Sequence, residues 1–342
     1  MKREKALLEK EIISKAEAIK TMLRSGYLLE SRISALLRGR GWVVESNSAY
    51  MDPITGKSRE LDVHGIGGAS IYDDERGNAF VFQHLLIECV NSPQPVLFIS
   101  SEQMMNDRKV ELIKEISDPP LVFDDGYFHR LPSYLKLEEF HHYTTAPLAT
   151  QFCSFVKKKG SDEWMALHEE TQYGSFVALG QAVEFHLTEN GQLARRSAGN
   201  HSKPYPPHIE FFYPIYVVEG ELWSIDQSEE TPEPKNVDRI NYKHSTFVDG
   251  VFQEYIVSVV TEEKFLQFLE QLESEVTKIA NHINEKIDDF EASQRQISVM
   301  DEEKVARLPI AVSPHLARIV AATIVMRERE AKQDLEDTTN NE

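Results

Sequence analysis

The chain has 342 residues, of which 41% are hydrophobic and 27% charged, a composition typical of a soluble globular protein with one large domain or two ordinary ones. Its net charge of −19 argues against a protein that coats nucleic acid nonspecifically, because phosphate binding relies on Lys and Arg. The first twenty residues are charged throughout and no long uncharged apolar run follows, which argues against a signal peptide or a membrane span.

The first hundred residues predict two helices followed by a β-rich segment. Apolar residues at three- and four-residue steps indicate an amphipathic helix over 2–24, and a second helix over 27–38 ends at Gly39. A strand over 42–46 precedes a turn over 52–57 that is marked by Pro and Gly. Strands over 58–72 and 79–90 surround the polar turn 73–78 and have the pattern of a hairpin. Residues 95–100 form a further buried strand, expected as a parallel neighbour.

The rest of the chain alternates between helical and extended patterns. Helices are expected near 104–116, 133–141 and 162–188, and residues 195–208 have the composition of a loop. Strands are expected at 209–218, 221–226, 239–248 and 252–260. A long helix over 262–290 and a last helix over 313–331 precede a polar tail that is typical of disorder.

The helix over 262–290 carries a narrow apolar seam. Its members recur at steps of three and four residues: Phe265, Leu269, Leu272, Val276, Ile279, Ile283 and Ile287. Packing on the chain's own sheet is the ordinary explanation for such a seam. The alternative is a homodimer contact through residues 262–290.

Charge is spread unevenly along the chain. Residues 1–60 contain 12 Lys and Arg against 8 Asp and Glu, a local balance of +4, so the remainder carries −23. A phosphate-bearing ligand is therefore expected to approach the N-terminal part, although basic surface helices are also common. Two cysteines, Cys89 and Cys153, have neither disulfide nor metal-type spacing, and the default expectation is a cytoplasmic protein.

Two carboxylates lie in stretches that otherwise read as buried strands. Residues paired across an antiparallel hairpin have a constant index sum, here about 150, so Asp62 and Glu88 are expected to face each other. Two carboxylates at that distance repel, so one stays protonated or both bind a cation such as Mg²⁺. An ion-pair network and a metal site explain the pair equally well on this evidence.

Glu30 is a third acidic candidate. It lies one helical turn before Ile33 and Leu37 and so borders the buried face of the helix over 27–38. The alternative is a surface residue paired with a neighbouring Arg.

Three segments, in this order, resemble the restriction-endonuclease-like nuclease superfamily, whose signature is PD-(D/E)XK. GYLLESRISALLRGRGW (26–42) is similar to the opening helix with its Glu, here Glu30. NSAYMDPITGKSRELDV (47–63) is similar to the strand, turn and strand that end in the metal-binding Asp, here Asp62. LLIECVNSPQPVLFIS (85–100) is similar to the strand with the (D/E)XK element, here Glu88, and to the next core strand. No motif after residue 100 matches.

The resemblance implies an α/β (α+β) fold with a central mixed β-sheet flanked by helices. Residues 1–100 would form the nuclease-like core and 101–205 a mostly helical insertion. Residues 206–331 would complete the core or be appended to it, and 332–342 would be a disordered tail. It also implies Mg²⁺ or Mn²⁺ bound by Asp62 and Glu88, with Glu30 in support, and phosphodiester hydrolysis of nucleic acid in defence or DNA processing.

The sequence departs from the family at the motif lysine, which positions and activates the attacking water. That position is Val90, which can neither donate a hydrogen bond nor carry charge. The nearest replacement is Lys57, at the mouth of the strand that carries Asp62, although a solvent-exposed turn lysine is the commoner case. Lys109 and Asn91 are weaker candidates.

Other constellations are less specific. His64 shares a strand face with Asp62 and is a candidate to line the site, although a packed or surface histidine is commoner. His141 and His142, near Glu138 and Glu139, have the residue types of a zinc site, but adjacent histidines on a helix diverge, and a surface position is expected.

Two further hypotheses remain beside the enzyme. One is a catalytically degenerate nuclease-fold module for binding or assembly, which the net charge and Val90 favour. The other is a defence-system subunit whose partner subunit supplies the missing basic group. Retention of Glu30, Asp62 and Glu88 favours the enzyme.

Overall fold

The structure is a computed structural model that describes residues 12–73, 77–100, 104–167, 170–198, 207–248 and 251–298. Its helices are α1 (Lys15–Arg24), α2 (Tyr27–Gly39), α3 (Asn106–Val110), α4 (Leu131–Tyr134), α5 (Glu170–Ala198), α6 (Glu262–Glu285) and α7 (Ile287–Ser298), with short 3₁₀ turns η1 (Leu137–Glu139) and η2 (His142–Thr144). None of the described helices combines the length and apolar character that crossing a membrane requires.

The described strands form three sheets. The first eight strands in the chain are β1 (Val43–Met51), β2 (Ser58–Asp73), β3 (Gly77–Asn91), β4 (Val96–Ser100), β5 (Lys114–Asp118), β6 (Val122–Asp124), β7 (Tyr127–His129) and β8 (Leu148–Ala149). The others are β9 (Gln151–Lys157), β10 (Trp164–Leu167), β11 (His208–Glu219), β12 (Leu222–Asp226), β13 (Lys235–Asn236), β14 (Arg239–Val248) and β15 (Val251–Thr261). The central sheet has the order β1-β2-β3-β11-β15-β14-β8, with β5 also paired to β11. A second sheet has the order β10-β9-β4-β12-β13, and β6 pairs with β7.

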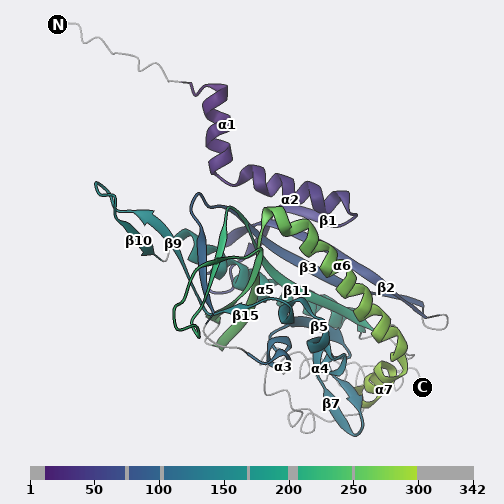
Figure 1. Cartoon of the computed structure of the whole chain (residues 1–342). Helices are drawn as coiled ribbons and strands as arrows, with labels where there is room; N and C mark the ends of the chain where they lie inside the picture. Colours follow the sequence, from purple (N-terminus) through teal and green to yellow (C-terminus); the bar gives the residue numbers. More distant parts are fainter. Residues whose placement is uncertain are drawn as a thin grey trace, which may run out of the picture.

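The central sheet is mixed and is covered by helices on both faces (Figure 1). β1, β2 and β3 form an antiparallel meander, β11 runs parallel to β3, and β15 runs parallel to β11. Helices α2 and α6 pack on one face, and α5 packs on the other. The expected α/β architecture with a helix-flanked mixed sheet is therefore confirmed.

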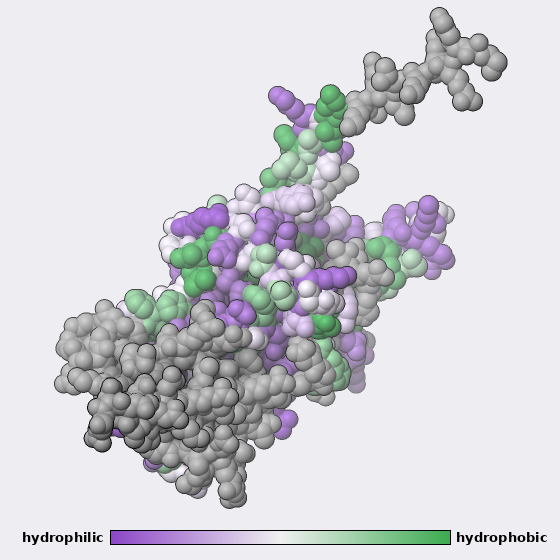
Figure 2. Space-filling view, turned by 180° about the vertical axis from the view of Figure 1, so that it is seen from behind, coloured by the Kyte–Doolittle hydropathy of each residue, from purple (hydrophilic) through white to green (hydrophobic). Residues whose placement is uncertain are grey.

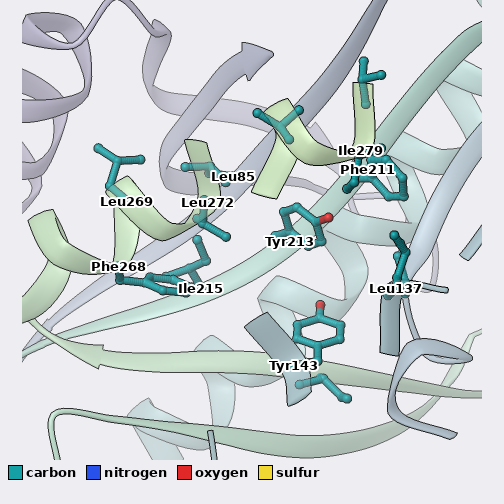
Figure 3. Close-up of a cluster of buried hydrophobic side chains, with 14 of the residues drawn as sticks. Leu85, Leu137, Tyr143, Phe211, Tyr213, Ile215, Phe268, Leu269, Leu272 and Ile279 are labelled. Carbon is teal, nitrogen blue, oxygen red and sulfur yellow. The ribbon is translucent and has the colours of Figure 1, made fainter. Parts of the chain in front are cut away.

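β11 shows why the sheet is buried on both faces. Its apolar run alternates between the two clusters, because Phe211, Tyr213 and Ile215 pack with α6 while Phe212 and Tyr216 pack with α5. Figure 3 shows the α6 side of this core, where Phe211, Tyr213 and Ile215 contact side chains of α6. A strand buried in this way lies at the centre of the sheet.

The apolar seam of α6 packs on the central sheet. Phe265, Leu269, Leu272 and Ile279 are each fully buried in the chain's own core. The ordinary explanation for the seam is thus confirmed, and a homodimer contact through it finds no support because the side chains are already covered.

Several predicted elements have different bounds or types. The first helix begins at Lys15, where Ser14 forms a capping box with Glu17, and positions 2–11 lie outside the described residues. The helix expected over 104–116 is only α3, followed by strand β5. The helices expected over 133–141 and 162–188 are likewise replaced in part, by α4 with η1 and by strand β10 before α5. The 101–205 segment therefore supplies strands as well as helices. The helix expected over 313–331 lies outside the described residues.

The strand over 95–100 is present as β4, but its expected position is wrong. β4 pairs with β12 and β9 in the second sheet, whereas the parallel neighbour of β3 is β11. Between β3 and β11 the chain adds β4, β9 and β10 to the second sheet, and β5 and β8 to the central sheet. A strand pattern alone carries no information about which of two sheets receives it.

Candidate metal centre

The hairpin of β2 and β3 opens at the predicted acidic pair. Its register runs from Asp73 opposite Gly77 to Val63 opposite Ile87, which confirms the expected index sum of 150. At the next position, hydrogen bonds to the side chains of Asp62 and Glu88 replace the bonds between the two backbones. The Cys89 N–H donates to Asp62 Oδ2 over 2.7 Å, and the Asp62 N–H donates to the Glu88 carboxylate. The two strands therefore separate around the two carboxylates.

Glu30 joins this pair from α2. The helix begins at Gly26, whose φ of 83° is a conformation that side-chain-bearing residues rarely adopt. A Cβ at Gly26 would lie 3.3 Å from the Cys89 carbonyl oxygen and 3.9 Å from Glu30 Oε1. Glycine thus allows the start of α2 to approach the β3 backbone closely, and this approach brings Glu30 within the field of Asp62.

The electrostatics of the three acids are those of uncompensated carboxylates. Burial, reinforced by the charge of Asp62, raises the pKa of Glu88 to about 8. Burial and the same charge raise the pKa of Glu30 to about 7. Burial also raises the pKa of Asp62, although the Cys89 N–H opposes the shift. Ser175 of α5 forms a hydrogen bond with Glu88.

No ion pair between a described Lys, Arg or His and any of these three acids is present. Arg32, on the same helix as Glu30, pairs instead with Glu219 and Glu262. Carboxylates that repel and lack a cationic partner favour protonation or a bound cation. Oxygen donors of this kind are the ligands that Mg²⁺ and Mn²⁺ prefer.

The structure places Val90 and Lys57 away from any charged pairing. Val90 is half-buried and packs against the apolar cluster on the α5 side of the sheet. Lys57 is exposed in the turn between β1 and β2, where its backbone carbonyl accepts a hydrogen bond from the Asp52 N–H over 2.9 Å. The proposed role of Lys57 therefore stays a prediction.

Asn91 and Lys109, the two weaker candidates to replace the motif lysine, have different environments. Asn91 donates to the Leu23 carbonyl over 2.7 Å and to Glu219 Oε2 over 3.0 Å, so its amide ties α1 and β11 to the end of β3. Lys109 is buried on α3, and burial lowers the pKa of its amine.

Arg59, three residues before Asp62 on β2, is a cation that the sequence patterns did not single out. Its Nε donates to Asp52 Oδ2 over 2.8 Å, and the Asp52 side chain is 0% exposed. Burial alone would raise the pKa of Asp52, but hydrogen bonds from Thr55, Ile54 and Arg59 outweigh it and lower the value to about 2. The signal in the sequence is Asp52 at the start of a Pro-Gly turn, where an Asp side chain bonds to the backbone ahead of it.

Arg59 faces Tyr50 across the β1–β2 ladder. The Tyr50 hydroxyl donates to the Ala178 carbonyl over 3.0 Å. Burial and the charge of Glu88 raise the pKa of Tyr50, while the charge of Arg59 opposes the shift. Tyr50 thus lies within the fields of both Glu88 and Arg59.

His64 is a packed histidine. Its Nε2 lies 3.1 Å from His84 Nδ1, and His84 Nε2 lies 3.2 Å from Glu210 Oε2. The other oxygen of Glu210 bonds to the partly exposed His208, so the chain of polar groups runs from the buried His64 to the surface. Burial, with repulsion from His186 and His84, lowers the pKa of His64 to about 3. Its expected role as a lining residue gains no contact with Asp62.

The surface position expected for His141 and His142 is wrong, because both are 0% exposed. The chain forms the turn η2 here instead of an α-helix, and both rings contact the carboxylate of Glu275 on α6. Figure 3 shows Tyr213 and Tyr143, which enclose this site. The donor atoms of the two histidines and Glu275 all lie within 4.8 Å of one another, a spacing that a metal ion could bridge.

Hydrogen bonding accounts for His141 and Glu275 without an ion, whereas the buried His142 Nε2 has no hydrogen-bond partner among the described residues. The Tyr143 N–H donates to His141 Nδ1 over 3.1 Å, so the neutral ring carries its proton on Nε2. Nε2 then faces Glu275 Oε1 at 3.2 Å and the Tyr213 hydroxyl at 3.2 Å. A metal on Nε2 would move the proton to Nδ1, directly against the Tyr143 N–H. This geometry favours a structural network, which leaves the Glu30, Asp62 and Glu88 cluster as the stronger candidate.

Comparison of the chain with protein-family models, with curated proteins and with solved structures gave no match.

Proposed function

We propose that the chain is a metal-dependent phosphodiesterase with a restriction-endonuclease-like core, acting on nucleic acid. The observation that carries the proposal is the convergence of Glu30, Asp62 and Glu88 from α2, β2 and β3. The order of helix, antiparallel meander and parallel return strand supports the same assignment.

Asp62 and Glu88 would hold Mg²⁺ or Mn²⁺, and Glu30 would support them. A bound divalent ion polarises a phosphate and lowers the pKa of its own water. The raised pKa values of Glu30 and Glu88 favour binding of that ion, because a bound cation reduces the repulsion between the carboxylates that protonation would otherwise reduce. The β2–β3 backbone pairing ends at Val63 and Ile87, so both carboxylates lie at one end of the hairpin, where Glu88 is buried and Asp62 is half-buried.

Catalysis requires a cationic side chain that replaces the motif lysine. Of the two cations beside the β1–β2 turn, Arg59 is the one held in place, by Asp52. The described hydrogen bonds of Arg59 use only Nε, so both Nη groups can donate to a phosphate. Arg59 is therefore a second candidate, beside Lys57, to replace the motif lysine whose position Val90 occupies.

A catalytically degenerate binding module is the second candidate function. The observation that favours it is the apolar packing of Val90, which leaves the motif position without charge. In this case the acidic pair would be structural, and the missing group would be absent or would come from a partner subunit.

Thermal unfolding and nucleic-acid cleavage in Mn²⁺ test the proposal together. Wild type should gain melting temperature as Mn²⁺ is added, because a ligand that binds only the folded state stabilises it. Asp62→Asn should lose this gain and all cleavage of plasmid, single-stranded DNA and RNA. Glu60→Gln is the matched control, an exposed carboxylate two residues away on the same strand.

The outcomes separate the two functions. Equal stabilisation of wild type and Asp62→Asn would refute the metal site and favour the binding module. Stabilisation without cleavage by wild type would refute the enzyme.

A further inference from the structure

The second sheet carries aromatic side chains on the face opposite α5. Trp223 pairs with Leu97 across β12 and β4, and Leu97 pairs with Cys153 across β4 and β9. Side chains two residues apart share a face, so Phe155 lies on the same side as Cys153. The alternate residues Val96, Phe98 and Phe152 are buried on the opposite side, against α5.

The row of aromatic side chains continues onto the β9–β10 hairpin. Phe155 pairs with Ala166, and the next same-face pair is Lys157 with Trp164. The Phe155 and Trp223 ring centroids are 6.1 Å apart, and Lys157 Nζ lies 5.6 Å from the Trp164 ring centroid. Trp164 is 50% exposed. We call Phe155, Trp164, Trp223 and Lys157 the aromatic platform.

The hairpin extends away from the body of the molecule (Figure 1). Seen from behind, its tip is hydrophilic and its base hydrophobic (Figure 2). The tip contains Lys157, Lys158 and Lys159, the only run of three consecutive basic residues in the sequence. Lys157 and Lys158 pair with Asp162 and Glu163 at 3.3 and 3.4 Å, but such exposed pairs are weak and exchange readily for phosphate.

A cavity of about 480 Å³ lies between the platform and the loop that follows β3. Phe155, Lys157 and Trp164 line one side, and Ser92 and Gln94 line the other. The cavity therefore combines aromatic surface, one cation and neutral hydrogen-bonding groups. These are the groups that hold an unstacked nucleobase and its phosphate.

We infer that the aromatic platform binds single-stranded nucleic acid, with bases stacked on Trp164 and Phe155 and the backbone along Lys157–Lys159. The inference deepens the proposed function by naming the form of its substrate. Ser92 directly follows the end of β3, four residues after Glu88 and about 13 Å along the chain at most, so a bound nucleic-acid strand can extend from the platform towards the acids.

β10 is also the edge strand of its sheet, and an exposed edge can pair with a strand of another chain. Strand addition would use the β10 backbone and would require neither the aromatic row on the sheet face nor the lysine tip. The platform's composition therefore favours nucleic acid over a second copy of this chain.

Binding of a fluorescein-labelled oligo(dT) of about 15 nucleotides, measured by anisotropy in EDTA and low salt, tests the inference. Wild type should bind, and Trp164→Ala should weaken binding by about 5- to 150-fold, the effect of losing one base–aromatic stack. Lys157→Ala should weaken binding and reduce its salt dependence. Phe252→Ala is the matched control, because Phe252 is 53% exposed on the separate β14–β15 hairpin and should leave binding unchanged.

Three results would overturn the inference. They are no binding by wild type, equal binding by Trp164→Ala, and equal binding of duplex and single strands. A dimer seen by light scattering that Trp164→Ala disrupts, with oligo(dT) binding unchanged, would assign the hairpin to self-association. The binding assay contains no metal, so loss of oligo(dT) binding by Trp164→Ala tests the platform alone, whereas loss of the Mn²⁺-induced melting shift by Asp62→Asn tests the metal site alone. Failure of the platform and failure of the metal site are therefore distinguishable.

Discussion

Replacing Glu88 with Gln tests whether the buried acids carry uncompensated charge. Without metal, ionising Glu88 in the folded state costs free energy that the unfolded chain does not incur. Its pKa is about 8 in the folded protein against an ordinary 4.5, and each tenfold change in proton affinity is worth 1.36 kcal/mol. Between pH 4.5 and pH 7 the wild-type protein should therefore lose about 3 kcal/mol of stability through this group.

The sign follows from proton linkage. A carboxyl with a raised folded pKa gives full stability below its unfolded pKa and loses it as the pH rises through the folded value. Glu88→Gln has no proton to lose, and its amide oxygen can still accept the Asp62 N–H. In EDTA the variant should therefore gain on wild type by about 3 kcal/mol between pH 4.5 and pH 7.

Urea unfolding followed by circular dichroism at both pH values measures this gain. Glu60→Gln serves as the control, since Glu60 is exposed on β2 and its replacement should leave the pH dependence unchanged. Parallel pH profiles for wild type and Glu88→Gln would refute the reasoning, because they would show that Glu88 is already compensated. With Mn²⁺ at pH 8, the order should reverse, as only wild type keeps the ligand.

Three other substitutions examine separate parts of the account. Ile279→Glu places a charge in the fully buried α6 seam, a cost of several kcal/mol, and should give an unfolded or insoluble product; a folded monomer would contradict the packing. If the enzyme is active, replacing the catalytic cation, either by Arg59→Ala or by Lys57→Ala, should lower Mn²⁺-dependent cleavage about 100- to 1,000-fold while the Mn²⁺-induced melting shift persists. A residue whose alanine variant keeps full activity is not the catalytic cation. If wild type is inert, Val90→Lys should create metal-dependent cleavage, and continued inactivity would favour the binding module.

The hairpin and its acids were predictable because local rules determine them. A polar turn between two alternating apolar runs sets the register, so the index sum of Asp62 and Glu88 followed from the turn position alone. The seam of α6 was equally predictable from its three- and four-residue steps. Glu30 required the additional expectation that its helix packs against this hairpin.

The errors arose where long-range contacts decide the structure. β4 has the pattern of any buried strand, and only the path of the insertion places it beside β12. The environment of His142 depends on Glu275, which is 133 positions away, and on a 3₁₀ turn where an α-helix was expected. The role of Arg59 was not predictable, because its ion pair depends on the burial of Asp52, which a turn motif does not indicate.

The most direct test of the central claim is the location of Mn²⁺ by anomalous diffraction in crystals soaked with the ion above pH 8. We expect an anomalous peak about 2 Å from carboxylate oxygens of Asp62 and Glu88, with Glu30 beside it. The same soak of Asp62→Asn crystals should lose the peak. An empty space between Asp62 and Glu88 in the wild-type crystal, or a peak at His141, His142 and Glu275 instead, would contradict it.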